Sequence, residues 1–208
     1  MNENMKIWDS FKNTNPKYTK KFKRSGGFSG TDISPTWRQM LMTQQFGPCG
    51  QGWGWVVERT WHENGCVFAQ VNLWTRIDDG KKGFTGAHIG GTKTGTRSDD
   101  ESYKMAITDA FGKCCASLGV GADIYTGQFD DSKYQREMTD HFTEVEKAAS
   151  WKFSIDEVKG MCEKCDSPET LEEIRTKVRT SAPPKQAFDA LKEIFSATAD
   201  RLQNSQAS

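Results

Sequence analysis

Two dipeptides, Asn64-Gly65 and Asp79-Gly80, constrain the fold of this chain more than any other feature. Each lies between runs of β-branched and aromatic residues, where such dipeptides are the strongest short signal for a tight β-hairpin. Short connections join antiparallel neighbours, so the runs should form a meander. The pattern predicts three strands, from Trp53 to Trp61, from Cys66 to Ile77 and from Gly83 to Ile89.

A long amphipathic helix should follow the third strand. Ser98 and Glu101 have the spacing of a capping box, and Gly119 is typical of the left-handed residue that ends a helix. Gly112 disagrees with this helix, because a glycine in mid-helix costs about 1 kcal/mol relative to alanine. The apolar stripe at helical spacing consists of Tyr103, Ile107, Phe111, Cys114 and Leu118. A sheet packed on such a helix predicts an α+β fold.

The segment before the strands is of another kind. Residues 1–30 are polar, basic and rich in glycine toward their end, so we expect an arm or loop there. Next, Ser34 as cap, Pro35 at the first helical position and Gly47 as stop signal predict a short helix.

The segment after the long helix loses aromatic density and shows helical patterns. We expect a polar linker near residues 135–150, followed by three helices with caps at Ser154 and Ser167. The apolar face of the last helix would carry Phe188, Leu191, Ile194 and Phe195. The predicted organisation is a basic arm over residues 1–25, a core over 26–139 and a helical unit over 140–208.

Targeting signals are not apparent. No apolar run approaches the length of a membrane span, and the first residues, MNENMKIWDSFK, have no apolar core of a signal peptide. We therefore expect a cytoplasmic protein without a membrane partner, and its six cysteines in the reduced state.

Metal and catalytic patterns are weak. Cys162 and Cys165 have the spacing of half a zinc site, but also that of two cysteines on adjacent faces of a helix. The segment GGTKTGT departs from the phosphate-loop pattern, because Lys93 follows Thr92 and not a glycine. Its amides could still hold phosphates, or it could be a plain connection. We expect no enzyme activity, no metal and no cofactor, with a nucleotide-dependent recombinase or nuclease as the alternative.

The charge is unevenly distributed, although the net charge is +0. Residues 1–30 hold seven basic and two acidic residues, which suits either a polyanion partner or a solubilising tail. Basic residues and aromatic residues alternate along the whole core, as in proteins that bind single-stranded nucleic acid. The basic residues are Lys20, Lys21, Lys23, Arg24, Arg38, Lys81, Lys82, Lys93, Arg97, Lys104 and Lys113.

Several motifs, in order, resemble the Rad-fifty-two-type single-strand annealing proteins, and most of all their bacteriophage (Sak-type) relatives. They are GGF-x-GT from Gly26, FGP-x-G-x-GWGW from Phe46, K-x-A-x-TDA-x-x-K-x-x-x-x-LG from Lys104, and ADI-x-x-G-x-FDD-x-KY from Ala122. The resemblance covers about residues 22–134, and it leaves residues 140–208 aside.

The resemblance implies ATP-independent annealing of complementary single strands in phage homologous recombination and DNA repair. It implies a β-β-β-α core that assembles into a homo-oligomeric ring with single-stranded DNA in a basic groove. The C-terminal helices would bind a single-strand DNA-binding protein or an exonuclease, in the host cytosol if a phage encodes the chain. A ring-forming adaptor that does not bind DNA is a further alternative.

The resemblance also assigns DNA contacts. Lys113 falls on a groove arginine of the family, whereas Gly112 falls where eukaryotic members have a second groove lysine. Lys93 and Lys133 match lysines of an outer DNA site, and Arg38 lies within one residue of another groove arginine. The expected DNA-binding residues are Lys113, Lys93, Arg97, Lys104, Arg38, Lys133, Lys21, Lys23 and Arg24.

Overall fold

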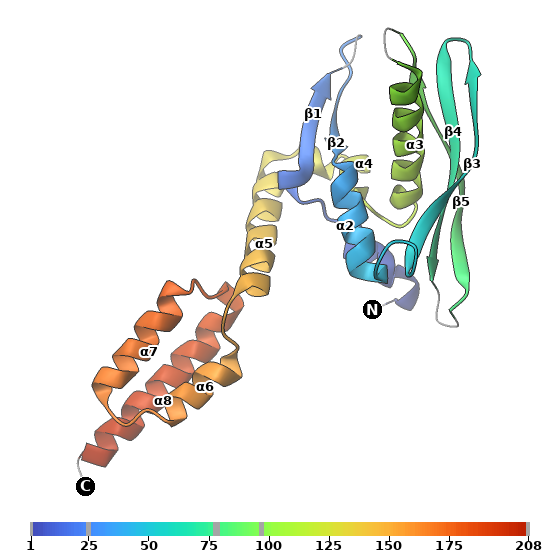
Figure 1. The fold of residues 1–208 in the computed structure, drawn as a ribbon. Helices are drawn as coiled ribbons and strands as arrows, with labels where there is room; N and C mark the ends of the chain where they lie inside the picture. The colour runs from blue at the N-terminus through green and yellow to red at the C-terminus, as the bar shows by residue number, and fades with distance from the viewer. Residues whose placement is uncertain (1, 24–25, 77–79, 96–97, 207–208) are drawn as a thin grey trace. The chain divides into compact units, whose positions relative to one another are not determined.

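The computed structural model describes residues 2–23, 26–76, 80–95 and 98–206, and the chain forms two compact units, Met1–Met138 and Thr139–Ser208. The first unit contains a three-stranded antiparallel sheet and several helices, so the predicted α+β class is confirmed (Figure 1). Among the described residues, no helix combines the length and the apolar character needed to cross a membrane.

The sheet is formed by β3 (Trp53–Glu63), β4 (Cys66–Arg76) and β5 (Lys82–Lys93), in the order β3-β4-β5. Asn64 and Gly65 have positive φ angles of 50° and 69°, as a tight hairpin of primed type requires. The predicted meander is therefore confirmed. The third strand is longer than expected and includes residues 90–93, which the sequence assigned to a loop. The second predicted turn includes residues 77–79, which lie outside the described residues.

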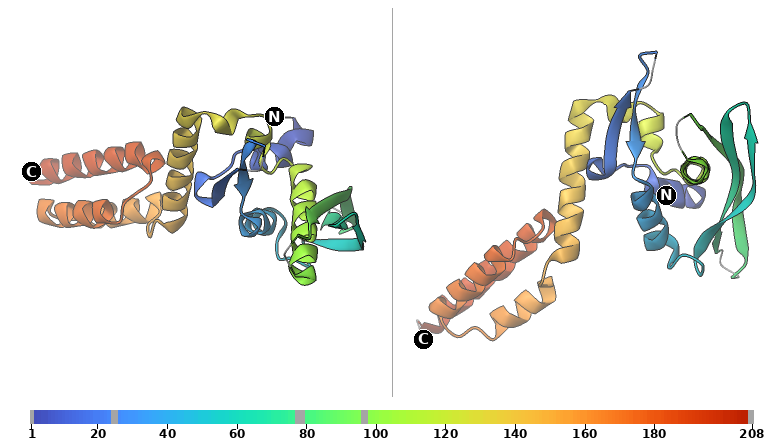
Figure 2. Two further views of the ribbon diagram at one scale, coloured as in Figure 1. Left: turned by 90° about the horizontal axis from the view of Figure 1, so that it is seen from above. Right: turned by 45° about the horizontal axis from the view of Figure 1, so that its top comes forward.

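Helix α3 (Asp99–Ala116) lies along one face of this sheet (Figures 1 and 2). Val67 and Ala69 of β4 pack against Ala106 of α3, and all three are buried. The approach is closest at Gly90 of β5, where a Cβ would collide with backbone atoms of Ala106 and Ala110. The other face carries exposed side chains, such as Val56, Phe84 and Ile89.

The two ends of α3 compare differently with the predictions. The capping box is wrong, because the Ser98 side chain makes no capping bond and instead hydrogen-bonds to Asp100, which lowers the pKa of that carboxyl. The C-terminal signal is confirmed, since Gly119 has a φ of 101°. The Gly119 amide donates to Ala116 O at 3.0 Å and the Val120 amide to Cys115 O at 3.2 Å, the two bonds of a Schellman motif.

Residues 2–23 and 26–33 are folded, although an arm or loop was expected over residues 1–30. They form η1 (Glu3–Met5), α1 (Lys6–Phe11), η2 (Pro16–Tyr18), β1 (Thr19–Lys23) and β2 (Ser29–Ile33). Phe11 and Ile33 are buried, and Trp8 lies against the turn at Gly119. Single buried residues that are spread over a polar segment produce no periodic pattern of apolar residues. The sequence therefore gave no signal for the fold of this segment.

Helix α2 (Pro35–Phe46) begins directly after Ser34 and ends before Gly47, whose φ is 91°, so the predicted bounds are confirmed. It buries Trp37 and Met42, and Tyr18 stacks on Trp37 at a centroid distance of 6.0 Å. Since Tyr18 directly precedes β1, this contact holds the base of the β1–β2 hairpin on α2.

A continuous helix, α5 (Ser132–Ser150), follows α4 (Ala122–Tyr125) and η3 (Gln128–Asp130), where a polar linker was expected. None of its side chains is fully buried, which explains its polar composition.

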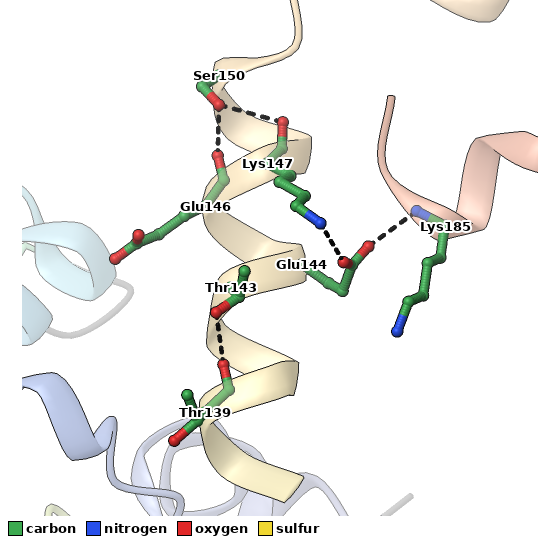
Figure 3. A network of polar contacts seen from close by, with 7 residues as sticks. All are labelled: Thr139, Thr143, Glu144, Glu146, Lys147, Ser150 and Lys185. Atoms are coloured by element: carbon green, nitrogen blue, oxygen red, sulfur yellow. Dashed lines mark hydrogen bonds and ion pairs between the residues drawn. The ribbon is translucent and has the colours of Figure 1, made fainter. Parts of the chain in front are cut away.

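In the second unit, Glu144 accepts a bond from Lys147 Nζ at 2.9 Å and from the Lys185 amide at 2.8 Å (Figure 3). These bonds lower the pKa of the Glu144 carboxyl.

The second unit has the three predicted helices, α6 (Ile155–Glu163), α7 (Pro168–Thr180) and α8 (Phe188–Gln206), with η4 (Lys185–Ala187) before the last. Ser154 and Ser167 cap their helices as predicted. Leu191, Ile194 and Phe195 take part in the core, whereas Phe188 is exposed.

Candidate nucleic-acid interface

A buried arginine lies on the middle of α3. Arg38 projects from α2, is only 9% exposed, and packs against Gly112. A Cβ at position 112 would lie 3.2 Å from both Cζ and Nη1 of Arg38, which is tighter than ordinary contact. The mid-helix glycine therefore makes room for a guanidinium group. This contact accounts for the helix-propensity cost that the sequence left unexplained.

The charge of Arg38 is only loosely compensated. Asp32 of β2 is its ion-pair partner, but the distance from Nη2 to Oδ1 is 3.7 Å, which is too long for a hydrogen bond. Burial raises the pKa of the nearby Cys115 thiol to about 12, although the charge of Arg38 acts in the opposite direction. The thiol is thus neutral at ordinary pH and supplies no negative charge to the guanidinium. Such a group is suited to receive an anionic ligand.

Lys113 occupies the neighbouring face of α3, because successive helical residues are rotated by about 100°. Its Nζ donates to Ile89 O of β5 at 2.8 Å and to the Asp109 carboxylate at 3.0 Å. The same Asp109 oxygen accepts the Gly91 amide at 3.1 Å. Asp109 thus connects helix, strand and lysine, and it holds the ammonium group at the β5 side of α3 while leaving it half-exposed.

The residues of the predicted GGTKTGT loop are mostly in a strand. Gly90, Gly91 and Lys93 belong to β5, and the Gly91 amide is bonded to Asp109. Both alternatives for this part of the segment, a loop that holds phosphates and a plain connection, are therefore replaced by a strand. Lys93 is exposed at the end of β5 opposite Cys66, and Arg97 lies outside the described residues.

The remaining predicted residues lie on α3 itself and on two other elements, α5 and β1. Lys104 is exposed on α3 near Asp100. Lys133 lies in the first turn of α5, and its Nζ is 3.9 Å from the Glu137 carboxylate on the same helix. Lys21 and Lys23 are exposed on β1, as is Lys20, and Arg24 lies outside the described residues.

The structure therefore joins part of the predicted set. It brings Arg38 of α2 to Gly112, directly beside Lys113, and we call these three residues the α2–α3 cluster. The spacing of Asp109 and Lys113, four residues apart on a helix, indicated their ion pair. The bond from the Gly91 amide to Asp109 could not be predicted from the sequence. No sequence signal pairs Arg38 with Gly112 except the unexplained glycine itself.

Metal-binding groups do not gather in the described part of the chain, where no three His, Cys, Asp or Glu side chains are placed to hold an ion. Cys162 and Cys165 are both buried in the core of the second unit. Their backbone carbonyls accept bonds from Arg201 Nη2 at 2.9 Å and 2.7 Å, which close the end of α6. Cys162 belongs to the last turn of α6, whereas Cys165 lies just after the helix, so the two cysteines are not on adjacent faces of one helix.

Comparisons with known proteins add no further assignment: no protein-family model matches the chain, and no curated protein matches it.

Proposed function

We propose that the protein binds single-stranded DNA and anneals complementary strands without ATP, in the manner of the phage Rad-fifty-two-like (Sak-type) annealing proteins, in homologous recombination and DNA repair. The observation that carries this proposal is the α2–α3 cluster. The Arg38 guanidinium packs on Gly112, and Lys113, which the resemblance places in the groove, is the next residue of the same helix. A guanidinium and an ammonium group so placed can each contact a backbone phosphate.

The proposed mechanism needs binding but no covalent chemistry. Arg38 and Lys113 would hold successive phosphates, so that the bases of the bound strand stay available to a complementary strand. Asp109 would release part of its hold on Lys113 as a phosphate approaches, because both anions compete for the same ammonium group. The loss of a basic residue at position 112 is offset by Arg38, whose guanidinium lies over that position.

A homo-oligomeric ring is part of this proposal, and the uncovered sheet face is the surface we assign to contacts between copies. Val56, Phe84 and Ile89 are exposed there, with Phe84 at 55%. Trp61 stacks on Phe68 at 5.3 Å, and Arg59 lies 4.6 Å from the centre of the Trp61 ring. Glu58 accepts hydrogen bonds from Gln70 and Asn72 on the same face. The face therefore combines exposed apolar and aromatic side chains with a polar network, a mixture found at protein interfaces. The mass of the assembly, measured with and without single-stranded DNA, tests this part.

The helical unit completes the proposal as the site for a protein partner, a single-strand DNA-binding protein or an exonuclease. Its core closes on itself through Val158, Leu171 and Leu202, so the unit has its own packing and can present a surface independently of the sheet. Phe188, at the start of α8, is its most exposed large apolar side chain among those described.

The decisive experiment measures annealing of complementary oligonucleotides with Lys113→Glu and Lys93→Glu separately and together. Each reversal removes one phosphate contact, so affinity for single strands should fall about tenfold per site at low salt, and the salt dependence should become shallower. Lys192→Glu, an exposed lysine on α8, serves as the matched control and should change little.

Three results would contradict the proposal. Strands that anneal no faster with the wild-type protein than without it would remove the function itself. DNA-stimulated ATP hydrolysis or magnesium-dependent cutting would favour the enzyme alternative. Unchanged DNA affinity in the doubly reversed variant would favour the adaptor.

Gly112→Ala tests the α2–α3 cluster directly. The added methyl group should stabilise the helix by about 1 kcal/mol but displace the Arg38 guanidinium by a few tenths of an ångström. We expect nearly unchanged stability and a loss of single-strand affinity of about threefold to tenfold, equivalent to roughly 1 kcal/mol. Fluorescence anisotropy with a labelled oligonucleotide measures the affinity.

The control for this substitution is Gly160→Ala in α6, where an added Cβ meets nothing within 4 Å. That variant should gain stability and keep the wild-type affinity. If Gly112→Ala also binds DNA like the wild type, the glycine is a packing accommodation only.

A further inference from the structure

The β1–β2 hairpin is a second cationic element, separate from the α2–α3 cluster. It forms a sheet of only two strands, paired from Thr19 with Ile33 to Lys23 with Ser29 (Figure 1). Its base is anchored by the buried Ile33 and by Tyr18 on Trp37. An isolated two-stranded hairpin is only marginally stable in water. The part of this hairpin beyond its anchored base therefore adds little to the stability of the fold, which suggests that it serves a function.

The two faces of the hairpin differ in chemistry. Lys21 and Lys23 point to one face, because alternate residues of a strand share a face. Phe22 and Phe28 lie on the other face, with ring centroids 6.1 Å apart. The Phe22 ring covers Gly30, where a Cβ would come within 2.9 Å of it, whereas Phe28 is 61% exposed, a large fraction for a phenylalanine.

We infer that this hairpin is a base-stacking site for single-stranded DNA, with Phe28 as the stacking residue and Phe22 as its support. Lys20 shares the face of the exposed ring, and Lys21 and Lys23 lie on the opposite face of the same hairpin. A ring and lysines on one element are the groups by which single-strand binders stack bases and hold phosphates. The positive charge of Lys20, Lys21 and Lys23 selects a polyanion over an uncharged apolar partner. The inference rests on the proposed function and extends it, because the α2–α3 cluster contacts only the DNA backbone.

A consequence is discrimination between single strands and duplexes. The bases of a duplex are already stacked and cannot lie flat on Phe28 without being unstacked. The lysines, in contrast, contact phosphates of either form. The ring should therefore contribute affinity for single strands only.

The test compares Phe28→Ala with wild type on three probes: oligothymidylate, an abasic oligonucleotide of the same length, and a duplex. We expect about a tenfold loss on oligothymidylate and little change on the other two. Phe28→Trp should bind as the wild type, whereas Phe28→Leu, which is apolar but cannot stack, should behave as Phe28→Ala. Lys21→Glu should weaken all three, and Phe188→Ala, a similarly exposed phenylalanine in the helical unit, should weaken none.

The outcomes separate this inference from the function on which it rests. If the wild-type protein does not bind oligothymidylate, both fail. If the wild type binds and Phe28→Ala binds equally, or loses the same factor on the abasic probe, only the stacking role is overturned. Wild-type binding by Phe28→Leu, or a changed assembly mass in Phe28→Ala, would overturn the stacking role in favour of a protein contact. If Phe28→Ala loses only its binding to anionic lipid vesicles, the hairpin is a membrane contact instead.

Discussion

Gly90→Ala should destabilise the first unit by about 3 kcal/mol or more, the upper part of the range for overpacking. The Cβ of an alanine at this position would collide with the backbone nitrogen of Ala110 and the backbone oxygen of Ala106. Backbone atoms cannot rotate away as a side chain can, so β5 and α3 would have to separate. The contact between these two elements is the centre of the fold, which makes the effect large.

The neighbouring glycine provides the matched control. A Cβ at Gly91 would come within 2.7 Å of the Phe68 ring, a side chain on the half-buried outer face that can move. Gly91→Ala should therefore cost clearly less than Gly90→Ala. Hydrogen exchange of the full chain measures both, because peptides from α3 and β5 should lose protection while those from α6 to α8 keep theirs. Equal protection in the two variants would falsify the close approach at Gly90.

The second large effect is expected for Asp123→Ala. Asp123 is 2% exposed, and its carboxylate accepts the Thr14 amide at 2.7 Å, the Thr14 hydroxyl at 2.6 Å and the Tyr134 hydroxyl at 3.1 Å. These bonds connect the N-terminal segment, α4 and α5. Removal of the acceptor leaves buried donors without a partner, at a cost of about 3–5 kcal/mol in total.

The ionisation of Tyr134 gives this prediction a second measurement. Burial, and then the negative charge of Asp123, raise the pKa of Tyr134 from its ordinary 10.0 to about 12. A raised folded-state pKa means that this tyrosine stabilises the fold below pH 10, and that the contribution is lost as the pH rises toward 12. In Asp123→Ala the tyrosine should titrate closer to its ordinary value, as ultraviolet absorbance would show.

Asp130→Ala is the control for this substitution, since Asp130 is an exposed acid nearby in the chain. A double-mutant cycle with Tyr134→Phe isolates the pair, and the coupling should exceed about 1 kcal/mol because the two groups share one hydrogen bond. Additive effects of Asp123→Ala and Tyr134→Phe would show that the bond contributes nothing.

Elements with their own local signals were predictable. The sheet followed from β-rich runs and Asn64-Gly65, and the bounds of α2 followed from Pro35 and Gly47. The capped helices of the second unit likewise carry start signals within a few residues of one another. In each case the determining interactions are local, so the sequence window contains them.

Elements held by distant partners were not predictable. The N-terminal segment is ordered by single contacts such as Thr14 to Asp123, which are 109 residues apart in the chain. The capping box at Ser98 failed for a local reason instead: Ser98 is the N-cap residue, but its hydroxyl bonds to Asp100 and not to the helix backbone. The extension of β5 through residues 90–93 depends on α3, since Gly90 is chosen for its fit against that helix.

The sequence by itself determined the α+β class, the three-stranded meander, the long helix and the unequal distribution of charge, because these depend on hairpin signals, periodicity and composition. Only the tertiary structure decided that Arg38 lies on Gly112 and that Asp109 joins Lys113 to β5. The reason is physical: a guanidinium on a glycine of another helix is a contact between segments more than seventy residues apart, and nothing in either segment encodes its partner.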